Sequence, residues 1–430
     1  MKLRIGAALA YLRISPASPG RSVHPYTRLG DHEIPWKNKS TSLRTCSSLV
    51  GLTCFAFVAG VIIALKVKSA IDSSIPNKVH FDLNSVTGPV CNNTTVEHVK
   101  EIPNIVHYVW VLGNPNQLQL SFKFFISIYS AHLYIQPDAI YIHTDASPPV
   151  FANAKQSGST WTQRILNLPN VKYNQVPPPS QTTKGVPIER VEHKSDFLRL
   201  SALQKFGGIY LDTDAIPLRS LTPLRKTGFS TILSNQGALK MKHVGLINNG
   251  VMMSKPGSLF LEMFIQGSNE FFDGSWSGVS TDFLTDLANR LSVVPGEVLI
   301  LQSNAFSPVG WELPGIEKLF KPHFSIPAKQ PLFQSLTSEK AGICENLFGW
   351  LREKEIFDKE SKEEWEIDFS STYVLHAFDE GMERIRGWDH SVDLRYVMGR
   401  QSNYAMAVFP AIKHAIEKGV IEGVEGEDYV

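Results

Sequence analysis

Net charge of either sign is almost absent from this sequence. Its 430 residues include 42 Lys and Arg against 41 Asp and Glu, which leaves a formal net charge of +1. Without a broad basic field, nucleic acid is not an expected partner. No internal repeat is apparent either. Hydrophobic residues make up 43% of the chain and charged residues 19%, which suits one large folded domain or two small ones.

Charged residues are missing altogether from Thr45 to Leu65, and this segment is strongly apolar. Because about 17 to 25 apolar residues span a bilayer, residues 46–66 are predicted to form a transmembrane signal-anchor helix. A buried core helix is the alternative, but few soluble helices are apolar on every face. The run is long and lies far from the start of the chain, which disfavours a cleaved signal peptide.

The orientation of this segment does not follow from charge, because the basic residues on its two sides are nearly balanced. Two overlapping glycosylation sequons lie beyond it, in residues 92–95 (NNTT), and a third lies before it. Residues 1–45 are predicted to be a cytosolic disordered tail and residues 67–100 a lumenal stem. Cys91 and Cys344 would then be lumenal, where a disulfide between them and two separate thiols are equally expected.

The most informative motif is an Asp-x-Asp that follows a short apolar strand. A predicted helix over residues 190–206 leads through a glycine pair into residues 209–212, and the motif is Asp212-Thr213-Asp214. Side chains at i and i+2 of a strand share a face, so the two carboxylates are expected to converge. Paired hard oxygen ligands suit Mg²⁺ or Mn²⁺ bound together with substrate phosphates. A solvated acidic turn is the alternative for such a short motif.

Asp196 and Arg199 lie three residues apart in the preceding helix. This spacing places their side chains on the same helix face. Taken alone, the pair is read most simply as an ion pair on a solvated surface.

Apolar runs of strand type alternate with helical stretches after residue 101. The predicted strands are residues 104–112, 139–143, 171–176, 209–212 and 230–234, and the predicted helices are residues 119–134, 159–167, 190–206 and 258–272. This alternation indicates an α/β sheet covered by helices. Ligands of such sheets bind beyond the carboxyl ends of the strands, where Asp212 and Asp214 lie.

Several segments together resemble glycosyltransferase family 32, which includes fungal Golgi mannosyltransferases and the galactosyltransferases of globoside synthesis. Residues 193–199 (HKSDFLR) and 207–214 (GGIYLDTD) resemble the sugar-binding DXD region of that family. Residues 102–110 (IPNIVHYVW) resemble its opening strand, residues 248–252 (NNGVM) its Asn-Gly segment, and residues 373–376 with Trp388 its closing motif. The sequence departs from the family pattern at residues 280–283 (STDF), which leaves the acceptor open.

The resemblance implies the GT-A fold, in which a Rossmann-like nucleotide-binding half merges with an acceptor half. We expect this catalytic domain over residues 101–400, followed by a C-terminal helix and acidic tail over residues 401–430. It also implies a single-pass type II protein of the Golgi or ER membrane, with the catalytic domain in the lumen.

The resemblance further assigns roles around the diphosphate. Asp212 and Asp214 are expected to hold it through Mn²⁺ or Mg²⁺. Asp196 and Arg199 are expected to hold the donor sugar and ribose. His376 is either a further metal or phosphate ligand or a structural histidine.

Other residues are expected to bind the donor more directly. Trp110 is predicted to stack on the nucleotide base or to be a core residue. Tyr210 is expected near the nucleotide or the core, pointing away from Asp212. Asn249 is expected to contact sugar hydroxyls or to form a turn, and Trp388 to close over the sugar.

The predicted reaction is metal-dependent transfer of a hexose, with retention of configuration, to a glycan or glycolipid hydroxyl. GDP-mannose is the first expected donor and UDP-galactose the second. Front-face attack is the expected route, with double displacement through a carboxylate such as Asp282 as the other. The alternatives to a transferase are a metal-dependent phosphohydrolase and a non-catalytic, membrane-anchored sugar-binding protein.

Overall fold

The computed structural model describes residues 101–237, 244–323 and 365–421, which all belong to one compact unit, Phe81–Val430. The predicted tail, membrane span and stem (residues 1–100), both lumenal cysteines and the acidic tail from residue 422 lie outside the described residues. Within the described ranges, no helix has the length and apolarity needed to cross a bilayer.

A seven-stranded mixed sheet forms the centre of the fold, with strand order β3-β2-β1-β4-β7-β6-β8. The strands are β1 (Ile105–Trp110), β2 (Ala139–Thr144), β3 (Val171–Gln175), β4 (Gly208–Leu211), β6 (Thr231–Ser234), β7 (Val251–Ser254) and β8 (Val298–Leu301). β3, β2, β1 and β4 run parallel, β7 is antiparallel to both of its neighbours, and β8 runs parallel to β6. The α/β sheet predicted from the sequence is therefore present.

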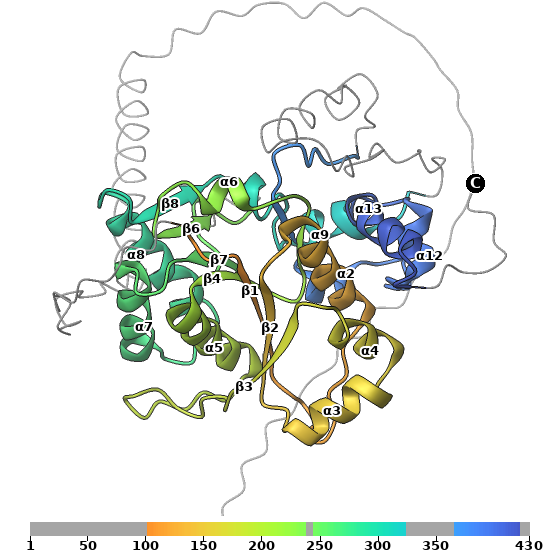
Figure 1. Ribbon diagram of the computed structural model, residues 1–430. Coiled ribbons are helices and arrows are strands. Elements are labelled where there is room, and N and C mark those ends of the chain that lie inside the picture. Colours follow the sequence, from red (N-terminus) through yellow and green to blue (C-terminus); the bar gives the residue numbers. More distant parts are fainter. Residues whose placement is uncertain (1–100, 238–243, 324–364, 422–430) are drawn as a thin grey trace, which may run out of the picture. The chain divides into compact units, whose positions relative to one another are not determined.

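Helices cover both faces of this sheet (Figure 1). One face is covered by α5 (Val191–Phe206), α7 (Leu259–Phe271) and α8 (Leu284–Leu291), and the other by α2 (Phe122–Ser130), α4 (Thr160–Leu166), α9 (Leu313–Phe320) and α13 (Asn403–Glu417). The remaining helices are α3 (Pro148–Ser157), α6 (Thr222–Arg225) and α12 (Leu394–Gly399). Because α13 packs into the same core as α2, the predicted C-terminal helix is part of this folded body.

Alternation along β4 separates the two cores. Ile209 and Leu211 pack with the α2 and α13 side, whereas Tyr210 packs with the α5 and α7 side. Successive side chains of a strand point to opposite faces, and both faces are covered here, so the strand reads as a continuous apolar run. Asp212 continues this alternation and therefore faces the same side as Tyr210.

Local signals explain where the helices begin and end. The helices α2, α4, α7 and α13 each follow a serine whose hydroxyl accepts a backbone N–H of the first turn, the typical N-cap contact. Gly207 ends α5 with a φ of 60°, and a side chain there would lie 2.5 Å from Pro256. The predicted helix over residues 119–134 is divided: α2 ends at Ser130 and a π-helical turn, Ala131–Ile135, follows.

The order of the strands positions the site. From β1 the chain moves outward to β2 and β3, and it then returns to β4 on the other side of β1. Ligands of open α/β sheets bind at such a reversal, outside the carboxyl ends of the strands. A second small sheet pairs β5 (Ala215–Pro217) with β9 (Val374–His376), and in its register Ala215 lies opposite His376.

A chain of buried hydrogen bonds crosses the three outer parallel strands. Gly207 O lies 2.8 Å from His107 Nε2, His107 Nδ1 lies 2.9 Å from His143 Nε2, and His143 Nδ1 lies 2.8 Å from Asn174 Nδ2. Because a carbonyl only accepts, every donor and acceptor in the chain is satisfied when both imidazoles are neutral. Burial lowers the pKa of His107 to about 4 and that of His143 to about 3.

Acidification should therefore destabilise the fold. Below the ordinary histidine pKa of 6.5, His107 and His143 become protonated in the unfolded chain but stay neutral in the folded chain. The free energy of unfolding therefore falls as the pH decreases toward 4. Between about pH 7.5 and about pH 5.5 we expect a loss of about 1 kcal/mol for each histidine. Urea unfolding at the two pH values measures it. His143→Gln should reduce the pH dependence, and equal stability of the native chain at both pH values would contradict this account.

Candidate active site

The two aspartates of the DXD motif converge through a turn, not through alternation along a strand. β4 ends at Leu211, one residue earlier than predicted. The N–H of Asp212 still donates to Gly250 O (2.7 Å), and the N–H of Ala215 donates back to Asp212 O (2.9 Å). The expectation that Asp212 and Asp214 share one face of a strand is thus wrong. A tight turn between β4 and β5 brings their carboxylates together instead.

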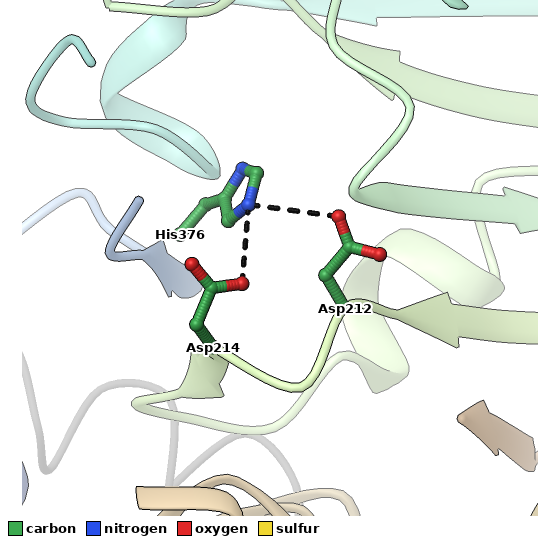
Figure 2. Close-up of side chains that lie close together, drawn as sticks. All are labelled: Asp212, Asp214 and His376. Carbon is green, nitrogen blue, oxygen red and sulfur yellow. Dashed lines mark ion pairs between the residues drawn. The ribbon is translucent and has the colours of Figure 1, made fainter. Parts of the chain in front are cut away.

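His376 completes a cluster with these carboxylates (Figure 2). Its Nε2 lies 3.4 Å from Asp214 Oδ1 and 3.7 Å from Asp212 Oδ2, and one ligand atom of each residue lies within 4.8 Å of the others. The pairing of β9 with β5 delivers the imidazole. Burial acts to lower the pKa of His376, but the carboxylates of Asp214 and Asp212 outweigh it and raise this pKa.

Each carboxylate uses one oxygen for its orienting contacts and turns the other toward His376. Asp212 Oδ1 accepts from Tyr210 Oη (2.6 Å) and pairs with Arg199 Nη1 (3.2 Å). Asp214 Oδ2 accepts the backbone N–H of Asp379 (3.0 Å). The remaining oxygens, Asp212 Oδ2 and Asp214 Oδ1, are the ones nearest His376. Two carboxylate oxygens and one imidazole nitrogen form a donor set that fits a divalent cation such as Mn²⁺.

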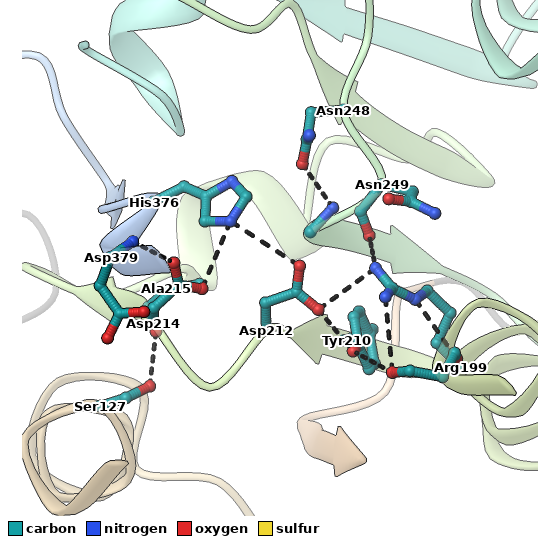
Figure 3. A network of polar contacts seen from close by, with 12 residues as sticks. Ser127, Arg199, Tyr210, Asp212, Asp214, Ala215, Asn248, Asn249, His376 and Asp379 are labelled. Carbon is teal, nitrogen blue, oxygen red and sulfur yellow. Dashed lines mark hydrogen bonds and ion pairs between the residues drawn. The ribbon is translucent and has the colours of Figure 1, made fainter. Parts of the chain in front are cut away.

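Arg199 organises the other side of the cluster (Figure 3). This side chain is 4% exposed, so the predicted solvated ion pair is wrong. Its guanidinium pairs with Asp196 Oδ1 (3.0 Å), donates to Asn249 O (2.7 Å) and lies 4.4 Å from the centre of the Tyr210 ring. Burial acts to lower the pKa of Arg199, but Asp212 and the other acidic partners outweigh it and raise this pKa. The guanidinium stays charged.

Tyr210 differs from the expectation. It was predicted to point away from Asp212, whereas its hydroxyl donates to that carboxylate, because residues at i and i+2 share a face. Its ring is 1% exposed. Tyr210 therefore orients the aspartate and does not present a surface to a donor.

Asn249 forms the predicted turn, and its contact with sugar hydroxyls stays a prediction. It lies in the turn before β7, and its Nδ2 donates to Asp196 Oδ1 (2.8 Å). The side chain of Asp196 remains 21% exposed. The side chain of Asp212 is 26% exposed, so both carboxylates of this network can accept a hydroxyl from outside.

The two tryptophans lie in packed surroundings. Trp110, at the end of β1, is partly buried and stacks on Phe124 with ring centres 5.4 Å apart. Trp388 packs against Tyr396 (5.4 Å) and Phe320 (6.4 Å). Their contacts to base and sugar stay predictions.

Two supporting residues were not found by sequence reasoning. Asp379 binds Asp214 through its backbone, and its carboxylate pairs with Lys123 Nζ at 2.5 Å. Asp379 lies three residues after His376, so the closing motif could have pointed to it. Nothing in the sequence around Lys123 connects that residue with the DXD segment.

Gly250 must lack a side chain because the site is packed against it. An added Cβ would lie 2.4 Å from His376 Cε1 and 2.6 Å from Asp212 Oδ2. We expect Gly250→Ala to displace these ligands and to weaken Mn²⁺ binding by at least about tenfold, measured by titration calorimetry. Gly113→Ala, where an added Cβ meets nothing within 4 Å, is the matched control. Equal Mn²⁺ affinity in both variants would contradict the close packing.

Tyr210→Phe tests the orientation of Asp212. Removing the hydroxyl leaves the buried ring in place but frees Asp212 Oδ1 from one of its two partners. Mn²⁺ affinity should fall by about tenfold with little change in thermal stability. The control is Tyr173→Phe, which removes a hydroxyl bonded to Ala146 O on the outer strand. If the two variants bind Mn²⁺ alike, Tyr210 does not orient the ligand.

Several solved structures with weak overall similarity are glycosyltransferases, and another is the 4-diphosphocytidyl-2C-methyl-D-erythritol synthase of Anaerococcus prevotii. The glycosyltransferase GlyE of Streptococcus pneumoniae has a TM-score of 0.35 at 12% identity, covering 76% of this chain and 66% of that one. The PaToxG glycosyltransferase has a TM-score of 0.32 at 14% identity, covering 46% of this chain and 71% of that one. The galactosyltransferase LgtC, in complex with donor and acceptor sugar analogues, has a TM-score of 0.28 at 17% identity, covering 47% and 74%.

Sequence comparisons are more specific. Residues 125–232 match the family described as glycosyltransferase sugar-binding region containing DXD motif. "Glucan organizing enzyme 1" of Cryptococcus neoformans is 28% identical over 226 residues, which is 50% of this chain and 57% of that protein. An uncharacterised Arabidopsis thaliana protein is 34% identical over 103 residues, or 23% of this chain and 14% of that protein. The chain thus spans little more than half of one relative and a small part of the other. The resemblance to glycosyltransferase family 32 is confirmed, and residues 125–232 carry the DXD-containing sugar-binding region.

Proposed function

We propose that this protein transfers a hexose from a nucleoside diphosphate sugar to a hydroxyl group of a glycan or glycolipid. One observation carries the proposal: two carboxylate oxygens and an imidazole nitrogen converge at the carboxyl edge of the sheet, beside a buried, charged Arg199. A cation held by one or two carboxylates typically takes further ligands from substrate phosphates, and ligands of such sheets bind at this edge.

The GT-A fold belongs to the same proposal. Its support is the order of the four parallel strands, the reversal between β1 and β4, and the position of Asp212 directly after β4. The nucleotide would then lie near Trp110, at the end of β1, and the diphosphate near the DXD turn.

The side chains divide the chemical work. A cation bound by Asp212, Asp214 and His376 would supply positive charge for the departing diphosphate. Asp196, the partly exposed carboxylate, would accept hydroxyls of the donor sugar. Arg199 is occupied by Asp196, Asp212 and Asn249 O. It acts on the donor through these groups, as a positioning residue.

For the stereochemistry we propose retention by front-face attack. The candidate nucleophile for double displacement, Asp282, lies exposed in the π-helical turn Gly278–Phe283, and its Oδ2 accepts from Ser277 Oγ (3.4 Å). This contact is local to the turn and does not connect Asp282 with the metal ligands.

The proposals for the donor, the acceptor and the membrane location rest on the sequence. GDP-mannose is the first proposed donor and UDP-galactose the second. The name of the Cryptococcus relative refers to a glucan, which supports a glycan acceptor and adds UDP-glucose to the donors to be tested. Anchoring in the Golgi or ER membrane is supported by the uncharged segment within residues 46–66 and the sequons of residues 92–95.

Replacing one metal ligand tests the function. In the full-length chain with Mn²⁺, Asp212→Asn and Asp214→Asn should abolish sugar transfer, as a chelator should in the native chain, because an amide cannot replace the carboxylate charge. The fold should persist, since asparagine has the size of aspartate and Arg199 keeps Asp196 and Asn249 O as partners. Asp286→Asn, which breaks a surface pair with Arg290 (2.8 Å), serves as the control.

Two results would count against the proposal. Undiminished, metal-dependent transfer by Asp212→Asn would reject the site. Release of nucleotide or phosphate that never requires an acceptor would instead indicate the phosphohydrolase.

A further inference from the structure

Helix α2 supports the DXD turn from the side on which Asp214 lies, away from Arg199 (Figure 3). Ser127 donates from Oγ to Ala215 O (2.6 Å), which follows Asp214 directly. Lys123 lies one helical turn earlier on the same face of α2, and its Nζ pairs with Asp379 Oδ2 (2.5 Å). A helix of the core thus contacts the chain on both sides of the Asp214 carboxylate.

The turn after β9 touches two of the proposed metal ligands. Phe378 has a left-handed backbone with a φ of 51°, and its ring centre lies 4.1 Å from that of His376. The next residue, Asp379, donates its N–H to Asp214 Oδ2 (3.0 Å). A left-handed conformation is uncommon for a bulky residue and persists where surrounding contacts hold it. The orientation of His376 and Asp214 therefore depends on how firmly this turn is held.

Two contacts of different kinds hold the turn. At its start, the N–H of Ala377 donates to Asp214 O (3.0 Å), which is a main-chain contact with the DXD segment itself. The ion pair of Asp379 with Lys123 connects the turn to α2, whose side chains are mostly buried in the core. The two charged side chains are 33% and 18% exposed, so solvent and salt screen this pair less than a surface pair.

The same ion pair keeps a third carboxylate away from the cation. Among the described residues, the cluster that can hold a metal ion consists of Asp212, Asp214 and His376 and does not include Asp379. The carboxylate of Asp379 is instead occupied by the ammonium group of Lys123. Only the backbone of Asp379 contacts a metal ligand.

We propose that Lys123 is a positioning residue of the metal site, which holds the turn after β9 against Asp214 through its ion pair with Asp379. The inference rests on the proposed function, since it assigns a support to the cation that would carry the diphosphate. Lys123 acts through Asp379 and thereby sets how Asp214 and His376 face a cation.

The test is the double variant Lys123→Met/Asp379→Asn in the full-length chain. It removes one charge of each sign, so the net charge near the cation is unchanged, and asparagine keeps the backbone N–H that Asp214 accepts. Lys123→Arg keeps the ion pair and is the rescue variant. The matched control is Lys184→Met/Glu270→Gln, which removes a surface pair whose side chains are 52% and 33% exposed.

Three quantities are measured: the Mn²⁺ dissociation constant by titration calorimetry, the Mn²⁺ dependence of sugar transfer, and hydrogen exchange of residues 377–384 in the metal-free chain. In the double variant the dissociation constant should rise about three- to tenfold. The Mn²⁺ concentration for half-maximal transfer should rise by the same factor, while kcat at saturating Mn²⁺ stays unchanged. Exchange of residues 377–384 should be at least about fivefold faster.

Lys123→Arg and the control pair should behave like the native chain in all three measurements. Mn²⁺ affinity and exchange within about twofold of the native values in the double variant would overturn the positioning role, since a pair that mattered would change both. An equal change in the control pair would also overturn it, because the effect would then not be specific to α2.

Failure of the proposed function has a different signature. A native chain that binds neither Mn²⁺ nor Mg²⁺ would reject the metal–diphosphate site, whatever the variants do. Exchange in the metal-free chain then decides the support alone. Faster exchange of residues 377–384 in the double variant would support the link between α2 and this turn, and unchanged exchange would overturn it.

Discussion

The burial of one guanidinium determines how this site is built. Arg199 is a full positive charge removed from water, and an unpaired charge in that position would cost several kcal/mol. The structure surrounds it with Asp196, Asp212 and a backbone carbonyl. The ion pair with Arg199 occupies Oδ1 of Asp212. The contact that compensates the guanidinium charge therefore also leaves Oδ2 as the oxygen available to a cation. Stability and ligand geometry therefore depend on one interaction.

The carboxylate of Asp214 is oriented in the same way, with one oxygen occupied by a contact, but its partner is a different group. Asp214 uses one oxygen for the backbone N–H of Asp379 and leaves the other toward His376. Burial acts to raise the pKa of Asp214, but His376 and the donated hydrogen bonds outweigh it and lower this pKa. Asp214 is thus held ionised, and hydrogen bonds orient both aspartates. The glycine at position 250 keeps the space between them and the imidazole small.

The sequence predicted the local secondary structure, but it did not predict which polar side chains are buried. Apolar runs placed several main strands and helices within a few residues, because these signals are local. The spacing of Asp196 and Arg199 predicted a shared helix face but not its burial, which depends on β4, β7 and the Asn249 turn packing above it. The neutral state of His107 likewise depends on its burial, and its ring bonds to His143 and Gly207, one of them 100 residues away in sequence.

His376 reaches the aspartates only because β9, from near the C-terminal end of the chain, pairs with β5 beside the DXD turn. A ribosome therefore synthesises the two carboxylates long before it synthesises the imidazole that completes the cluster. Any cation held by all three residues links the late segment to the early one, and its binding free energy adds to the docking of that segment. A chain interrupted before β9 would contain the DXD motif without the imidazole of the cluster.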